Sequence, residues 1–307
     1  MKKSSSKNKK INIVEVGPRD GLQNEKKFLD VDTRVEFARR LTLTGIKTIE
    51  VGAFVSPQKV PQMADSKEVL ERILKIFDPK KINFPVLVPN EHGMQDAIEA
   101  GAREVAIFTA CSEKFNQANI NCSIEESFER FKPVLNLAKK NKIRVRGYLS
   151  TAFYCPYEGK MSPKKAIELS KRLLKLGCYE VSIGDTLGAA TPNEVSDVLK
   201  GLKKEIGAGK IAMHFHDTRG TALANILRSF ELGVRTFDSS LGGLGGCPYA
   251  PGAQGNVSTE DVVYMFHGMG LQTGIDLQKL IEVSQWMTSK MDKVLATRVG
   301  KAGLPKS

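Results

Sequence analysis

Two histidines lie two residues apart near the end of an apolar segment of this 307-residue chain. The segment reads Ile211-Ala212-Met213-His214-Phe215-His216-Asp217. Because side chains alternate along a strand, His214 and His216 point to one side and Phe215 to the other. A single buried histidine is usual in a core, whereas a pair at this spacing on a strand end favours a metal site.

Charged side chains also stand at the ends of other apolar segments. Arg19 and Asp20 follow the first segment in a Gly/Pro turn, Glu50 lies inside the second, and Asp185 ends the sixth. A glutamate inside an apolar strand is costly to bury unpaired, so Arg19 is its natural partner. Asp20 is a candidate third metal ligand. If the apolar segments are strands that close into a barrel, the first strand lies close to the seventh, which carries the two histidines.

A glycine-rich segment follows the last apolar segment. Residues 242–256 contain six glycines, two prolines and one thiol, Cys247. This composition predicts a mobile loop that carries a reactive group over the site. The segment lacks the Lys-Ser/Thr pair of a P-loop, which argues against a phosphate-binding role.

Eight short apolar segments alternate with amphipathic, helix-like segments. They are nearly continuous in apolar residues, as strands buried on both faces are. This alternation predicts an α/β fold, the (β/α)₈ TIM barrel, whose chemistry lies at the carboxyl ends of the strands. An open doubly wound sheet is the alternative, but no GxGxxG follows the first strand. The predicted strands are 11–16, 46–51, 82–88, 104–109, 143–149, 179–183, 211–215 and 235–239.

Signals at the ends of the helix-like segments support this division. Ser162-Pro163 and Thr191-Pro192 are N-cap and first-turn pairs. Glycine is common just after the last residue of a helix. Four glycines lie at such places, each before a predicted strand: Gly45, Gly101, Gly177 and Gly233. We expect residues 11–307 to form a single domain, with one or two additional helices in 271–307.

Part of the net charge of +12 lies in a short segment at the N-terminus. Residues 2–10 hold five lysines and no acid, which leaves 12 − 5 = +7 for the rest. A disordered basic tail over 1–10 explains this better than nucleic-acid binding. The sequence contains no run of 18 apolar residues, so no membrane helix is predicted. The N-terminus lacks the features of a signal or transit peptide. Five widely spaced cysteines without a CxxC pair favour a cytoplasmic location.

Several motifs together resemble the 3-hydroxy-3-methylglutaryl-CoA (HMG-CoA) lyase family over about residues 13–280. Some of them, namely Arg19, Asp20, Glu50 and the His-x-His strand, are shared by a larger group of barrel lyases and synthases. The cysteine-containing glycine loop that ends in Asn256 is more specific. The matching segments are 15–25 (EVGPRDGLQNE), 54–57 (FVSP), 60–63 (VPQM), 119–127 (NINCSIEES), 155–159 (CPYEG), 214–217 (HFHD) and the loop 242–256.

The resemblance implies cleavage of HMG-CoA to acetyl-CoA and acetoacetate, as in leucine degradation and ketone-body formation. It implies an acyl-CoA ligand and a divalent cation, Mg²⁺ or Mn²⁺, held by Asp20, His214, His216 and Asn256. We also expect a homodimer. One departure is Phe215, where animal lyases tend to carry cysteine. Since Phe215 points away from the two histidines, it leaves the predicted ligand set intact.

The resemblance also implies a catalytic role for individual residues, each matched to a step of this cleavage. The hydroxyl proton of the substrate must be removed, and either Asp20 or His214 is the base. Arg19, fixed by Glu50, stabilises the enolate oxygen, and Cys247 donates the final proton.

Contacts to the substrate are expected from Arg19, Asp185 and Glu260. A Claisen synthase or an aldolase of the same barrel group is the alternative function.

Overall fold

Strands and helices alternate along the chain. The computed structural model describes residues 10–246, 255–292 and 294–305. The strands are β1 (Asn12–Glu15), β2 (Thr48–Ile49), β3 (Gly52–Ala53), β4 (Val86–Leu87), β5 (Glu104–Ala110), β6 (Arg144–Ser150), β7 (Tyr154–Cys155), β8 (Gly159–Lys160), β9 (Glu180–Asp185), β10 (Ile211–Phe215) and β11 (Thr236–Ser239). The helices are α1 (Val31–Leu43), α2 (Ser66–Ile76), α3 (Glu91–Glu99), α4 (Glu113–Ile120), α5 (Ile124–Asn141), α6 (Pro163–Leu176), α7 (Pro192–Ile206), α8 (Ala222–Glu231), α9 (Thr259–Gly268), α10 (Leu277–Met291) and α11 (Arg298–Ala302).

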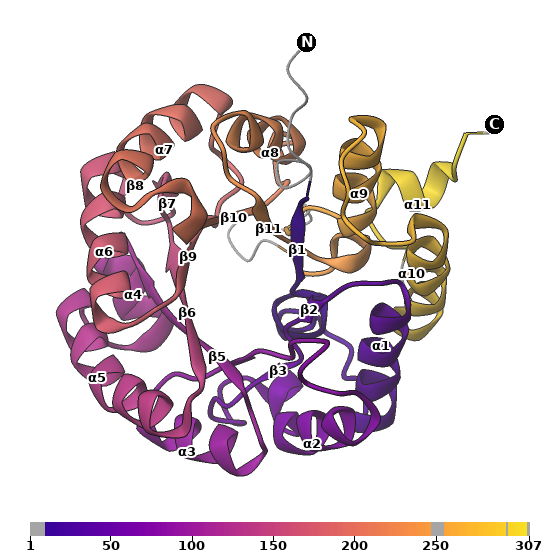
Figure 1. Ribbon diagram of the computed structural model, residues 1–307, viewed down its shortest axis with the longest axis horizontal. Helices are drawn as coiled ribbons and strands as arrows, with labels where there is room; N and C mark the ends of the chain where they lie inside the picture. Colours follow the sequence, from indigo (N-terminus) through magenta and orange to yellow (C-terminus); the bar gives the residue numbers. More distant parts are fainter. Residues whose placement is uncertain (1–9, 247–254, 293, 306–307) are drawn as a thin grey trace.

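The parallel strands form one sheet that closes on itself inside a ring of helices (Figure 1). Its order is β2-β1-β11-β10-β9-β6-β5-β4-β3, so the two ends are β2 and β3, which are consecutive in the chain. Between them, the N–H of Glu50 donates to Glu15 on one side, and the N–H of Val51 donates to Pro85 on the other. The segment 48–53 therefore occupies one strand position that joins both edges, and the predicted (β/α)₈ barrel is confirmed.

The predicted strands all appear, with two differences. The second one, 46–51, appears as two short strands, β2 paired with β1 and β3 paired with β4, with Glu50 and Val51 between them. The antiparallel hairpin of β7 and β8 was not predicted. Its strands are two residues long, which is too short for a side-chain periodicity to be visible in the sequence.

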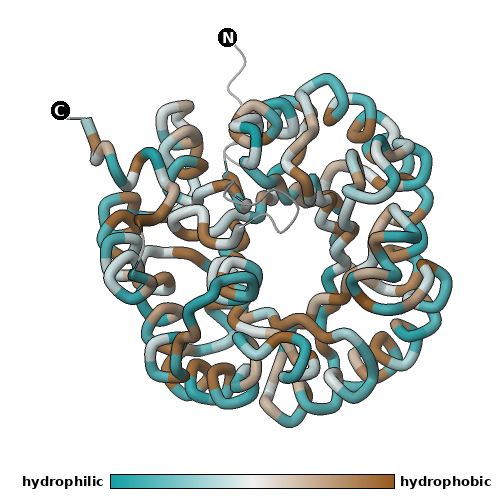
Figure 2. The backbone as a smooth tube through the Cα atoms, turned by 180° about the vertical axis from the view of Figure 1, so that it is seen from behind, coloured by the Kyte–Doolittle hydropathy of each residue, from teal (hydrophilic) through white to brown (hydrophobic). Residues whose placement is uncertain are grey.

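Most strand residues are buried, either inside the barrel or beneath the helices. Every residue of β9 is buried, and so is every residue of β5 except Phe108. Figure 2 shows hydrophobic stretches along the inner ring, while hydrophilic positions are frequent on the surrounding helices. This two-sided burial is the reason that the strands are continuous in apolar residues.

The predicted helix ends agree with the backbone. Ser162 and Thr191 are N-caps with proline in the first turn, and Thr191 forms a capping box with Glu194. The glycines expected at helix ends have positive φ values, for example 102° at Gly45 and 120° at Gly177. Glycine adopts this conformation without the steric cost that a Cβ atom would add.

Two helices follow the barrel, as predicted for 271–307. In α10, Trp286 contacts Phe37 of α1 with ring centroids 6.3 Å apart. Lys10, which the sequence placed in the basic tail, forms a bridge with Gln272, while residues 1–9 lie outside the described part of the chain. Among the described helices, none combines the length and the apolar character needed to cross a membrane.

Candidate active site

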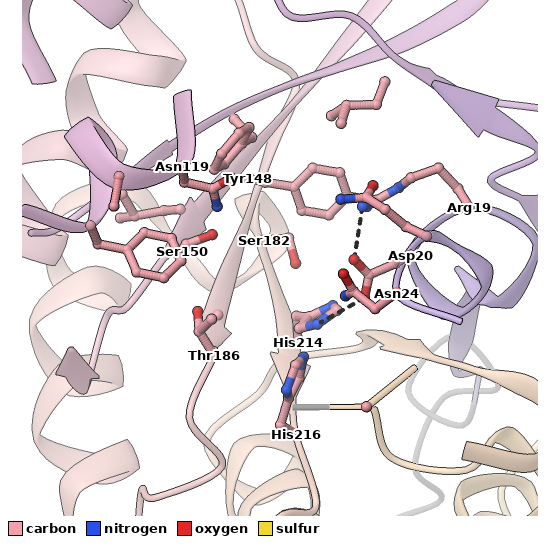
Figure 3. A pocket seen from close by; sticks show the side chains of 18 residues that line it. Arg19, Asp20, Asn24, Asn119, Tyr148, Ser150, Ser182, Thr186, His214 and His216 are labelled. Carbon is pink, nitrogen blue, oxygen red and sulfur yellow. Dashed lines mark hydrogen bonds and ion pairs between the residues drawn. The ribbon is translucent and has the colours of Figure 1, made fainter. Parts of the chain in front are cut away.

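The carboxyl ends of the strands surround a cavity of about 330 Å³ (Figure 3). This is the end of a barrel at which active sites are built. The cavity is lined mostly by polar side chains and by a few apolar ones. They include Arg19, Asp20, Gln23, Asn24, Leu87, Phe108, Phe115, Asn119, Tyr148, Ser150, Ser182, Thr186, His214 and His216.

Asp20, His214 and His216 converge at one side of this cavity (Figure 3). Their potential ligand atoms all lie within 4.8 Å of one another. The two imidazole rings have centroids 5.3 Å apart, and Nε2 of His214 lies 4.0 Å from Oδ2 of Asp20. The structure thus brings together the three side chains that the sequence suggested as ligands.

The turn that carries Asp20 depends on its glycines. Residues Gly17–Gly21 form a π-helical turn directly after β1. A Cβ atom on Gly17 would lie 2.5 Å from the Glu15 carboxylate, and one on Gly21 would lie 2.7 Å from the Ser240 hydroxyl. Real Cβ atoms do not approach so closely, so glycine at both positions lets the turn pack against the chain after β11.

Asn256 reaches the cluster from the far end of the glycine-rich segment. Its Nδ2 donates to Oδ2 of Asp20 at 2.8 Å, and its backbone forms a bridge with His216. An amide binds a cation through its oxygen, and the two amide ends differ by a half-turn of the side chain. Asn256 is therefore adjacent to the predicted ligands, with its nitrogen toward Asp20.

Arg19 is held between two carboxylates. Its Nε donates to Glu50 at 2.8 Å, its Nη2 lies 2.7 Å from the same oxygen, and its Nη1 donates to Asp20 at 2.8 Å. Tyr148 also donates to Glu50, at 3.2 Å. Burial raises the pKa of Glu50, and the charge of Arg19 opposes that rise. The pairing predicted for Arg19 and Glu50 is present. It holds the guanidinium in the wall of the cavity.

The charges of the cluster suit metal ligands. Burial alone would raise the pKa of Asp20, but Arg19 and the two histidines lower it to about 2. Burial, with His214 nearby, lowers the pKa of His216 to about 4. At neutral pH Asp20 is thus an anionic carboxylate and His216 a neutral imidazole, the forms that bind cations. Burial lowers the pKa of His214, but Asp238 and Asp20 outweigh burial and raise it.

Two further observations bear on whether a cation fits. Nδ1 of His216 is buried and makes no hydrogen bond within the described part of the chain. One carboxylate, two imidazoles and a neighbouring amide form a mixed nitrogen and oxygen donor set, which divalent first-row cations accept. The residues present therefore fit a divalent cation.

Other predicted site residues lie outside the cavity. Asp185 is buried and accepts from the N–H groups of Ala189 and Ala190, and burial raises its pKa to about 6. Glu260 is also buried and accepts from Gly242 N–H at 2.8 Å, beneath the start of the glycine-rich segment. Neither lines the cavity. Cys247 lies outside the described residues.

Sequence reasoning missed a group of polar residues inside the barrel. Tyr148 and Ser182 line the cavity, and Arg146 and Asp238 lie behind them, buried. A signal was present, because all four are polar residues inside predicted strands, namely 143–149, 179–183 and 235–239. Their pairing across the barrel was not visible, since 92 positions separate Arg146 from Asp238.

The fold and the site together define a (β/α)₈-barrel protein with a candidate metal site at the carboxyl ends of its strands. The family model described as HMGL-like matches residues 10–287. This chain belongs to that family.

Known proteins similar to this chain carry related names. The cytoplasmic 3-hydroxy-3-methylglutaryl-CoA lyase of Rattus norvegicus is 51% identical over 292 residues, covering 95% of this chain and 84% of the relative. The structure of hydroxymethylglutaryl-CoA lyase from Pseudomonas aeruginosa has a TM-score of 0.93 at 46% identity, covering 96% of this chain and 97% of that one. An Acinetobacter baumannii HMG-CoA lyase in complex with coenzyme A and 3-methylmalate has a TM-score of 0.92 at 35% identity, covering 99% and 100%.

Proposed function

We propose that this protein is a lyase that cleaves HMG-CoA into acetyl-CoA and acetoacetate. The observation that carries the proposal is the convergence of Arg19, Asp20, His214 and His216 on one cavity. The names of the similar lyases and the coenzyme A complex of one of them support an acyl-CoA substrate. The expected cytoplasmic location is part of the same proposal.

A divalent cation is the proposed cofactor, with Mg²⁺ or Mn²⁺ favoured over zinc by the oxygen donors. Asp20, His214 and His216 would hold it, together with Asn256 once its amide oxygen faces Asp20. When bound, such a cation supplies Lewis-acid polarisation of the substrate's hydroxyl oxygen.

Different side chains of the cavity remove the substrate proton and stabilise the charge that develops on the substrate. Asp20 or His214 accepts the proton of the C3 hydroxyl group, since both line the cavity. As the C2–C3 bond breaks, C3 becomes the ketone of acetoacetate, and the electron pair moves into the thioester enolate. The guanidinium of Arg19 stabilises the enolate oxygen, and Glu50 holds that guanidinium in place.

Protonation at C2 completes acetyl-CoA. We propose that Cys247 donates this proton, because a thiol with an ordinary pKa of about 8.5 is a workable acid at neutral pH. Asp185 and Glu260 are proposed to act on the substrate indirectly, through the backbone segments that their carboxylates hold.

The test is a direct assay of acetoacetate release from HMG-CoA after exhaustive dialysis against EDTA. We expect no turnover in the dialysed protein and recovery on addition of Mg²⁺ or Mn²⁺. His214→Ala is expected to abolish the recovery, and His92→Ala is the matched control, because the His92 side chain is 85% exposed. Full turnover after dialysis would end the metal proposal. Cleavage of a 4-hydroxy-2-oxo acid in place of HMG-CoA would indicate an aldolase.

A further inference from the structure

A second carboxylate lies against His214, on the side of the ring away from Asp20. Asp238 and His214 are partners in the parallel register of β11 and β10. Partners in neighbouring strands project to the same face of the sheet, which places both side chains inside the barrel. Oδ2 of Asp238 lies 3.4 Å from Nδ1 of His214, while Nε2 faces Asp20.

This carboxylate is fixed at both of its oxygens. Arg146 donates from Nη2 to Oδ1 at 2.7 Å, and Ser182 donates from its hydroxyl to Oδ2 at 2.7 Å. Arg146 is itself held by Glu180 through Nε at 3.0 Å. The Asp238 side chain is 0% exposed, so water does not compete for these contacts. The carboxylate therefore has one position, and His214 must adapt to it.

The ring hydrogen of a neutral imidazole is on Nδ1 or on Nε2. On Nδ1, it would point toward the Asp238 carboxylate. On Nε2, the bare lone pair of Nδ1 would face a buried anion, which is repulsive where the dielectric is low. Nδ1 of His214 is buried and makes no hydrogen bond among the residues that the structure describes, so the Asp238 carboxylate at 3.4 Å is the polar group it faces.

We propose that Asp238 is a positioning residue that keeps the ring hydrogen of His214 on Nδ1. The lone pair of Nε2 is thereby directed at Asp20 and His216. A carboxylate behind a metal-binding histidine fixes both the tautomer and the ring orientation. Nδ1 is buried without a hydrogen bond in both histidines within the described residues, but a carboxylate lies against it only in His214, at 3.4 Å. His214 is thus the ligand whose direction is set before a cation arrives.

The tautomer can be read directly in the metal-free wild-type protein. With only four histidines in the chain, ¹⁵N-histidine labelling gives four ring systems, assigned through single histidine-to-glutamine variants. Long-range ¹H–¹⁵N correlations of the neutral form are expected to show His214 protonated at Nδ1 and bare at Nε2. A His214 ring protonated at Nε2 would overturn the proposal. This measurement involves neither substrate nor turnover, so failure of the proposed reaction would not affect it.

A variant pair then tests the consequence for cation binding. Asp238→Asn is expected to weaken Mn²⁺ binding, measured by electron paramagnetic resonance, by about 10- to 100-fold. Ser182→Ala removes one hydrogen bond but leaves the carboxylate and Arg146, and its loss of affinity is expected to be clearly smaller. Unchanged Mn²⁺ affinity and an unchanged His214 tautomer in folded Asp238→Asn would contradict the proposal. If Asp238→Asn does not fold, the proposal is tested by the His214 tautomer measured in the wild-type protein.

Discussion

Replacing Arg19 by lysine keeps a positive charge beside Asp20 but removes the planar fork of the guanidinium. Arginine has five N–H donors. In this site one from Nε and one from Nη2 face Glu50, and one from Nη1 goes to Asp20. That leaves 5 − 3 = 2, one on each terminal nitrogen, for the enolate oxygen of a substrate in the cavity.

A lysine ammonium is a single point of charge and cannot serve both carboxylates and the enolate oxygen. Loss of one preorganised donor to a developing oxyanion costs about 10²–10³ in kcat, or roughly 2.7–4 kcal/mol. We therefore expect Arg19→Lys to lower kcat for HMG-CoA cleavage by that factor. KM is expected to change much less, because the enolate charge exists only in the transition state and beyond it.

The assay is acetoacetate release at saturating cation, with the melting temperature measured in parallel. Arg144→Lys is the matched control, because Arg144 pairs with a buried glutamate, Glu104, at 3.2 Å at the opposite end of the barrel. It is expected to retain wild-type kcat. An Arg19→Lys variant with kcat within about threefold of wild type, a barrier change below about 1 kcal/mol, would refute the assigned role.

Four further outcomes follow from the site and its surroundings. Cys247→Ser is expected to lose most of its kcat, since a hydroxyl is a far weaker acid than a thiol; near-normal turnover would remove the acid role. His216→Ala is expected to weaken Mn²⁺ binding, and an unchanged affinity would exclude it as a ligand. Burial raises the pKa of Glu15 from 4.5 to about 7, so the native state binds this proton more tightly than the unfolded state does. The free energy of unfolding should thus fall by up to about 3 kcal/mol as pH rises through this interval. Glu15→Gln should remove this dependence in urea titrations; parallel curves for the two proteins would contradict it. Deleting residues 2–9, which lack apolar side chains, is expected to leave kcat and melting temperature unchanged, and a large loss of either would show that they dock on the barrel.

Local patterns in the sequence were sufficient for the elements and for part of the site. Strand and helix periods, proline at helix starts and glycine at helix ends depend on neighbouring residues, and they predicted the barrel. Because every strand of such a barrel ends at the same rim, the sequence also predicted that Asp20 would meet His214 and His216.

The tertiary structure alone decided which buried charges pair and which of them face the cavity. Arg146 and Asp238 meet across the barrel only because closure brings distant strands together. Glu260 was expected to contact the substrate, yet it lies beneath the glycine-rich segment and accepts from Gly242 N–H. An acid in an apolar segment must find a partner when it is buried. Strand order, register and barrel closure determine that partner, and these are properties of the whole chain.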